Sequence, residues 1–156
     1  MTINKYDPQR IVNIIMRQFD KTGNRGLHTM PFAECPEMQR QELLQQLSLP
    51  ADEIPILVSV FDASNWAVLT TMRLLTRAGT DERQCQWDQL QRCEANMDGL
   101  KNHPDPKSLM KNLVVTTDTG ERLCLTTDPG PPLIGFWNCL LMAQRMAHEE
   151  RRRRQL

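Results

Sequence analysis

A series of short strand-like segments between residues 54 and 127 is the feature that most constrains the fold. Apolar and β-branched stretches alternate here with turn-forming clusters that contain Asp, Asn or Gly. Six strands are predicted, over residues 54–61, 66–77, 82–87, 92–97, 113–117 and 122–127. Because no helical pattern separates them, successive strands are expected to pair antiparallel in a meander. The fold class is therefore predicted to be α+β, with an antiparallel sheet at its centre.

The N-terminal region predicts two helices joined by a loop. Asp7 is expected to cap the first helix, with Pro8 at its first position, and the Gly23 region is expected to end it. The second helix is predicted over residues 36–47, and residues 25–36 before it are expected to form a loop. Its inward-facing side chains are predicted to be Met38, Leu43, Leu44 and Leu47.

A long amphipathic helix is predicted to close the chain, over residues 133–153. The proline- and glycine-rich residues 128–132 end the last strand before it. The stripe expected to pack on the sheet consists of Leu133, Phe136, Trp137, Leu140, Ala143, Gln144 and Ala147. Trp137 is expected to bury the largest area of this face. Acidic and basic side chains of residues 149–154 stand four positions apart, which predicts a solvated, ion-paired helix end.

The cysteines and histidines do not form a metal-binding pattern. The five cysteines include no CxxC pair, and His28, His103 and His148 stand far apart. No metal or cofactor is therefore expected. Cys35 precedes a helix start at Pro36 and is expected to be an ordinary cap-region cysteine; a reactive thiol, whose thiolate that helix start would stabilise, is the alternative. The other four cysteines lie among hydrophobic residues and are expected to be buried free thiols.

Charge and motifs argue against several function classes. The chain has 19 Lys and Arg residues and 19 Asp and Glu residues, so it lacks the basic excess typical of nucleic-acid-binding proteins. No GxSxG, P-loop or GxGxxG motif occurs, so an enzyme is not expected. The adjacent carboxylates Asp52 and Glu53 are expected to be solvated turn residues. The N-terminus does not resemble a signal peptide and residues 54–61 are too short to span a membrane, so a cytoplasmic location is predicted.

Residues 43–147 resemble the pleckstrin-homology-like superfamily, in particular its bacterial and GRAM-type members. The resemblance lies in the order of elements and in two short segments, LTTMRLL at residues 69–75 and QWDQL at residues 86–90. It implies a bent, partly open antiparallel barrel capped by the C-terminal helix, in a domain over residues 43–156. Residues 1–42 would then form a helical extension packed on that domain. The resemblance also implies a scaffold that binds phospholipid head groups or proteins.

Of these two binding functions, we expect a protein partner. Residues 54–72 contain no Lys or Arg, and Asp62 in this region would repel an anionic head group. The protein is predicted to act by docking, for example as an inhibitor such as the immunity partner of a toxin. The first candidates for partner contacts lie in the loop of residues 99–111 and are Lys101, His103, Asp105 and Lys107, with Met30, Met97 and Met110 as further interface candidates. The alternative is a lipid-surface adaptor that uses the arginine-rich tail.

Overall fold

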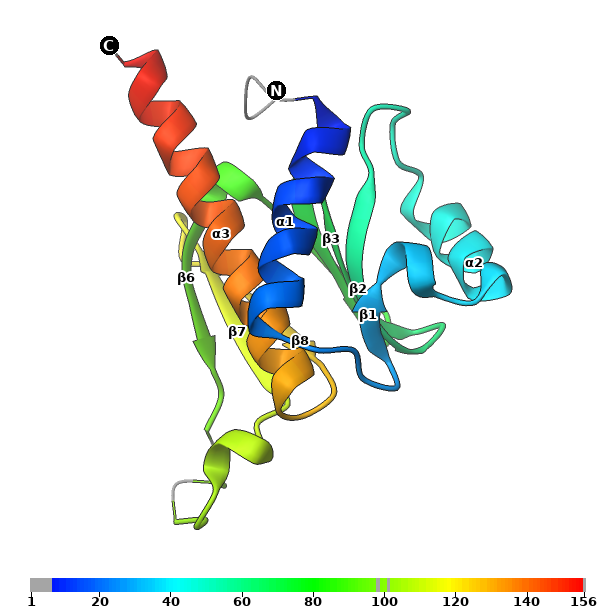
Figure 1. Cartoon of the computed structure of the whole chain (residues 1–156), viewed down its shortest axis with the longest axis vertical. Helices are drawn as coiled ribbons and strands as arrows, with labels where there is room; N and C mark the ends of the chain where they lie inside the picture. Colours follow the sequence, from blue (N-terminus) through cyan, green and yellow to red (C-terminus); the bar gives the residue numbers. More distant parts are fainter. Residues whose placement is uncertain (1–6, 98, 101, 156) are drawn as a thin grey trace.

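The computed structural model describes residues 7–97, 99–100 and 102–155 of the chain, except the side chain of residue 107. It is an α+β structure with two antiparallel sheets and a long C-terminal helix, which confirms the predicted fold class (Figure 1). The helices are α1 (Pro8–Thr22), α2 (Glu37–Leu47) and α3 (Pro131–Arg154), with short 3-10 helices η1 (Phe32–Glu34), η2 (Trp87–Gln89) and η3 (Pro106–Ser108). The strands are β1 (Thr29–Pro31), β2 (Pro55–Asp62), β3 (Asn65–Thr70), β4 (Arg73–Ala78), β5 (Asp81–Gln86), β6 (Leu90–Ala95), β7 (Asn112–Thr117) and β8 (Arg122–Thr126).

Both sheets follow the order of the chain. The first has the strand order β1-β2-β3-β4-β5 and the second β6-β7-β8, and every neighbouring pair is antiparallel. Gly79 and Gly120 occupy hairpin turns with φ angles of 67° and 87°, a conformation that glycine adopts without strain. The two sheets do not join into a closed barrel. The predicted meander is therefore correct, although it is divided between two sheets.

The main hydrophobic core lies between the two sheets and the helices α1 and α3. These helices pack side by side over the sheets, while α2 lies on the other face of the five-stranded sheet (Figure 1). The largest fully buried side chain is Trp87 of η2, and Phe19 of α1 and Phe136 of α3 are also completely buried. Trp137 is only partly buried and donates a hydrogen bond to the Cys93 carbonyl oxygen over 2.9 Å. The largest buried aromatic side chain is therefore Trp87 of η2. It is not Trp137, which keeps a polar contact at the edge of the core.

A close approach of backbone joins α1 to α3. A Cβ atom added to Gly135 of α3 would lie 2.8 Å from the Gly23 Cα and 2.8 Å from the Phe19 ring. Such distances are shorter than van der Waals contact, so this crossing requires a residue without a side chain. Asp7 accepts a hydrogen bond from the Arg10 amide at the other end of α1, as a capping carboxylate does.

Residues 25–36 were predicted to be a loop, and this is wrong in part, because they contain β1 and η1. The carboxylate of Asp128 accepts hydrogen bonds of 2.7 Å from the amides of His28 and Thr29. The Thr29 hydroxyl also lies 2.9 Å from the Ser59 hydroxyl. This short strand is therefore held by groups that are distant in the chain, which no local pattern reveals.

Two further predictions about local structure are corrected. The single strand predicted over residues 66–77 is divided by a turn at Thr71 and Met72, where β3 ends and β4 begins. In α2, Leu43 and Leu47 are buried, but Met38 is 74% and Leu44 is 43% exposed. Helix α2 lies on the surface of one sheet and contacts it along a narrow stripe, so it buries fewer apolar residues than predicted. Among the described residues, no helix is both long and apolar enough to cross a membrane.

Candidate binding surface

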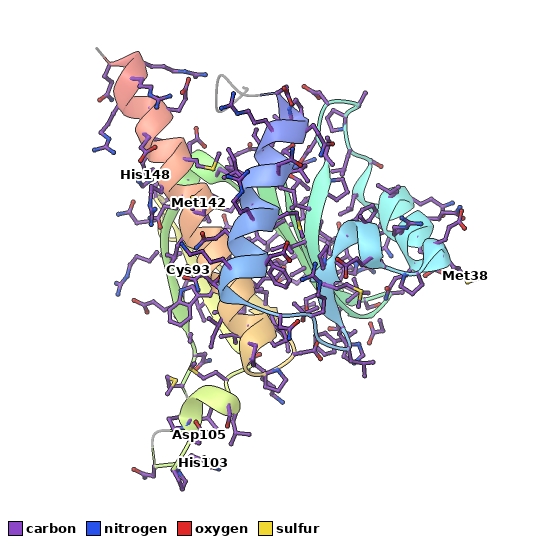
Figure 2. The ribbon with its side chains drawn as sticks, in the orientation of Figure 1. Met38, Cys93, His103, Asp105, Met142 and His148 are labelled. Atoms are coloured by element: carbon purple, nitrogen blue, oxygen red, sulfur yellow. The ribbon has the colours of Figure 1, made fainter. Side chains whose placement is uncertain are left out.

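The loop predicted to contact a partner projects from one end of the molecule (Figure 2). His103 and Asp105 are both exposed, and the Asp105 amide donates to the His103 Nδ1 atom over 3.1 Å. Lys101 and the side chain of Lys107 lie outside the described residues. Figure 2 shows His103 and Asp105 at the end opposite to His148, so this loop and the end of α3 do not form one compact site.

The methionines proposed for the interface lie in or against the two cores. Met110 is 5% exposed and belongs to the main core, so its prediction as an interface residue is wrong. Met97 packs against the same core and Met30 against the core beneath α2, and both are partly buried. A loop position therefore does not mean that a methionine is available to a partner.

All five cysteines are free thiols, and Cys35 does not have the properties of a reactive one. It is 4% exposed, and burial raises the pKa of its thiol to about 11. The loss of hydration outweighs any stabilisation of the thiolate by the helix end. Burial likewise raises the pKa of Cys85 and Cys93 to about 12. Cys124 was predicted to be buried and is instead exposed on β8. Among the described residues, no three side chains that could ligate a metal lie together.

Glu53 was predicted to be a solvated turn residue, and this is wrong. It is 5% exposed, and its Oε2 atom accepts hydrogen bonds from the Thr70 hydroxyl over 2.5 Å and from the Arg73 Nε atom over 2.9 Å. The Thr70 hydroxyl oxygen in turn accepts bonds from the amides of Met72 and Arg73. The LTTMRLL segment therefore contains the tight turn between β3 and β4. The ion pair of Glu53 with Arg73 closes this turn.

A hollow of about 680 Å³ lies beside the C-terminal half of α3 and the start of β6. We call it the α3 groove; its lining residues are Gln91, Leu141, Gln144, Arg145, His148, Arg151 and Arg152. Figure 2 shows His148 on the side of α3 that faces β6. The lining contains three arginines and one histidine but no carboxylate, thiol or hydroxyl group, so it suits an anionic ligand and offers no acidic repulsion.

Two polar contacts fix the groove walls in place. The Gln144 side-chain amide donates to the Gln91 carbonyl oxygen over 2.8 Å, which joins α3 to β6. The Arg151 guanidinium donates to the Asp88 carbonyl oxygen over 2.6 Å and lies 3.8 Å from the Asp88 carboxylate. These contacts occupy Gln144 and Arg151 and join the C-terminal half of α3 to β6 and η2.

The arginines at the end of α3 divide into two groups. Arg153 and Arg154 lie 3.8 and 3.5 Å from the carboxylate of Glu150, as the predicted ion-paired helix end requires. Arg145 and Arg152 are exposed, face the groove and form no ion pair with another described residue. The groove therefore presents two guanidinium groups that form no ion pair with another described residue, with His148 between them in sequence.

Sequence reasoning treated these arginines as one tail and missed the groove. The recurrence of Leu141, Arg145, His148 and Arg152 at steps of four, three and four residues was a signal for a shared face. Whether that face is exposed to solvent or covered depends on how α3 packs on β6. Comparison with known proteins finds no family model and no curated protein that matches this chain. The chemistry of the α3 groove is therefore the basis for assigning a function.

Proposed function

We propose that this protein is a non-enzymatic binding module that docks an acidic segment of a partner protein in the α3 groove. The observation that carries the proposal is the pair of exposed guanidinium groups, Arg145 and Arg152, which lack an ionic partner among the described residues. Guanidinium groups bind carboxylates through two parallel hydrogen bonds and are favoured at protein interfaces. The positive charge is local, since the whole chain is neutral.

The shape of the groove favours a protein over a lipid surface. A membrane is broad and flat, whereas Arg145 and Arg152 line a hollow that also contains Leu141, an apolar side chain 36% exposed. A mixture of arginine and apolar contact is typical of protein interfaces. A stable interface buries about 1,200–2,000 Å² in total, so the groove would be the centre of a larger contact.

The same docking supports an inhibitory role, such as that of an immunity protein. If the acidic segment belongs to the partner's own active site, its capture would block access to that site. We place the activity in the cytoplasm, because all five cysteines are free thiols and a reducing compartment preserves this state.

Charge reversal in the groove tests the proposal. The probes are a fluorescein-labelled, glutamate-rich peptide of about 15 residues and its glutamine counterpart, with affinity followed by fluorescence anisotropy. The double variant Arg145→Glu/Arg152→Glu is expected to lose at least about tenfold in affinity for the glutamate peptide, because repulsion replaces attraction at two positions. The matched control is Arg17→Glu/Lys21→Glu, which makes the same charge change on exposed positions of α1. Equal losses in the two variants would contradict a specific groove.

Vesicles distinguish the lipid-adaptor alternative. The probe is a phosphatidylserine-containing vesicle, used with the intact protein and with a variant that lacks residues 149–156. The proposal expects the acidic peptide to bind more tightly than the vesicle surface at physiological salt. Vesicle binding that depends on residues 149–156, without binding of the peptide, would replace the protein-docking function by lipid adaptation.

A further inference from the structure

We propose, on the basis of the function above, that the acidic segment docks as an α-helix lying alongside α3. The proposal concerns the conformation of the partner, which the charge of the groove does not define. It follows from the spacing of residues on α3, from the protection of the β6 edge and from the open shape of the groove.

Helix α3 has two faces with the spacing used in helix pairing. One face is buried and carries Leu133, Phe136, Leu140, Ala143 and Ala147, at alternating steps of three and four residues. The groove face carries Leu141, Arg145, His148 and Arg152, also at alternating steps of four and three residues. This alternation keeps side chains on one side of a helix over several turns, so a second helix can lie along them. The first face is covered by the core, and the second lines the α3 groove.

The edge of β6 does not favour the addition of an extended segment. Strand β6 lies at the edge of the three-stranded sheet, where a partner strand would normally pair. Its carbonyl groups at Gln91 and Cys93 already accept hydrogen bonds from Gln144 and Trp137, over 2.8 and 2.9 Å. A strand added there would have to break both contacts. The groove is therefore better suited to side-chain docking against α3.

The charges and the open shape of the groove match a short helix. Arg145 and Arg152 are seven residues apart in α3, which corresponds to about 10.5 Å along the helix axis. Carboxylates seven residues apart on a partner helix have the same separation. The hollow is open to solvent along this length, so a helix can lie in it side by side with α3.

Three labelled peptides of about 15 residues, with blocked ends, test the helical conformation. The first carries glutamates at steps of three and four on one face of an alanine-rich helix. The second has the same composition with the glutamates distributed around the helix, and the third is the first with a central Ala→Pro substitution that breaks it. The first peptide is expected to bind at least about tenfold more tightly than the others and to gain helicity by circular dichroism on binding.

Two outcomes would separate the failure of this inference from that of the proposed function. Equal affinity of the first and third peptides, lost in Arg145→Glu/Arg152→Glu, would overturn the helical conformation and leave acidic docking in place. No binding, or binding unaffected by the charge reversal, would overturn both.

The apolar end of the groove provides a second, uncharged test. Leu141→Ala is expected to weaken binding of the first peptide several-fold, because Leu141 continues the row of Arg145 and His148 along the helix. The matched control is Leu44→Ala on α2, where the leucine is similarly exposed at 43%. The control is expected to bind like the parent protein. Equal effects of the two substitutions would contradict an ordered helix along this face.

Discussion

The two halves of α3 differ in what they contact, although they form one continuous helix. Up to Ala143, the helix buries Leu133, Phe136, Cys139 and Leu140 in the main core. Beyond Ala143, arginines dominate, and the helix end extends past the sheets (Figure 1). The first half has apolar neighbours on most sides, whereas the second half buries Ala147 in the main core and is also held to the body by hydrogen bonds to Gln91 and Asp88.

This difference separates stability from recognition within a single element. Burial of apolar side chains supplies most of the free energy of folding, so substitutions in the first half should destabilise the protein. Exposed charges contribute little to stability, so the second half can vary its charge without loss of the fold. The proposed binding surface therefore lies on a helix whose position is fixed mainly by the buried residues of its first half.

The largest effect is expected from Phe136→Ala in the first half. Phe136 is fully buried, and its truncation leaves a cavity that costs about 3–5 kcal/mol of unfolding free energy. Leu141→Ala, five positions later, is expected to cost less than about 1 kcal/mol, because Leu141 is already 36% exposed. Chemical denaturation of both variants measures the difference. Similar losses would mean that Leu141 contributes to the core as Phe136 does.

A second contrast concerns two glutamates that pair with arginines. Glu53→Ala removes the buried acceptor of Thr70 and Arg73, and is expected to cost about 2–3 kcal/mol because it leaves a partly buried guanidinium unpaired. Glu150→Ala removes two ion pairs of 3.8 and 3.5 Å in which the arginines are exposed and Glu150 is partly buried, and it is expected to cost less than about 1 kcal/mol. Denaturation at low and high salt measures both. A large, salt-sensitive loss for Glu150→Ala would show that the helix end is structurally important.

These contrasts also show which features the sequence could reveal. The cap at Asp7 and the hairpins at Gly79 and Gly120 depend on residues adjacent in the chain, and their predictions are confirmed. The burial of Glu53 depends on Arg73, which is 20 residues away, and β1 depends on Asp128, about 100 residues away. Local patterns carry no information about such partners.

The candidate site was harder to predict than the fold, for a related reason. The arginines of α3 are visible in the sequence, but their different roles depend on which of them meet Glu150, Asp88 or the groove. The helix start after Cys35 raised the alternative of a reactive thiol, yet the depth of burial determines the pKa of this cysteine. Tertiary packing determines both the roles of the arginines and the pKa of Cys35, because it sets how well a charged group is hydrated.

Gly135→Ala tests the close contact between α1 and the first half of α3. The new Cβ would lie 2.8 Å from the Gly23 Cα, so the helices must separate. The gain in helix propensity of about 1 kcal/mol offsets part of the strain, and a net loss of about 1–2 kcal/mol is expected. This corresponds to a fall in melting temperature of about 2–8 °C. Arg145→Ala in the second half is the control and is expected to leave the melting temperature nearly unchanged.

Alkaline pH tests the burial of Cys139, again in the first half. Burial raises the pKa of its thiol well above the ordinary value of about 9, so above this pH the unfolded chain loses a proton that the folded chain retains. The free energy of unfolding should therefore fall as pH rises, by about 1 kcal/mol between pH 8 and pH 10 for this group. Cys139→Ala removes that part of the pH dependence, and Cys124→Ala on the surface should not. Identical pH profiles for all three proteins would contradict a buried thiol.

A small effect on stability is expected from the variant with the largest effect on binding. Arg145→Glu/Arg152→Glu introduces two acids three or four positions from Glu149, and the one at position 152 lies in the last turn of α3, where the helix dipole favours cations; the cost is about 0.5–1 kcal/mol at low salt. High salt should remove most of that cost, because the side chains are exposed. A loss of peptide binding with an almost unchanged unfolding curve would show that Arg145 and Arg152 serve recognition and not stability. A loss of both together would mean that the groove arginines also hold the helix in place, which would end the separation between the two halves.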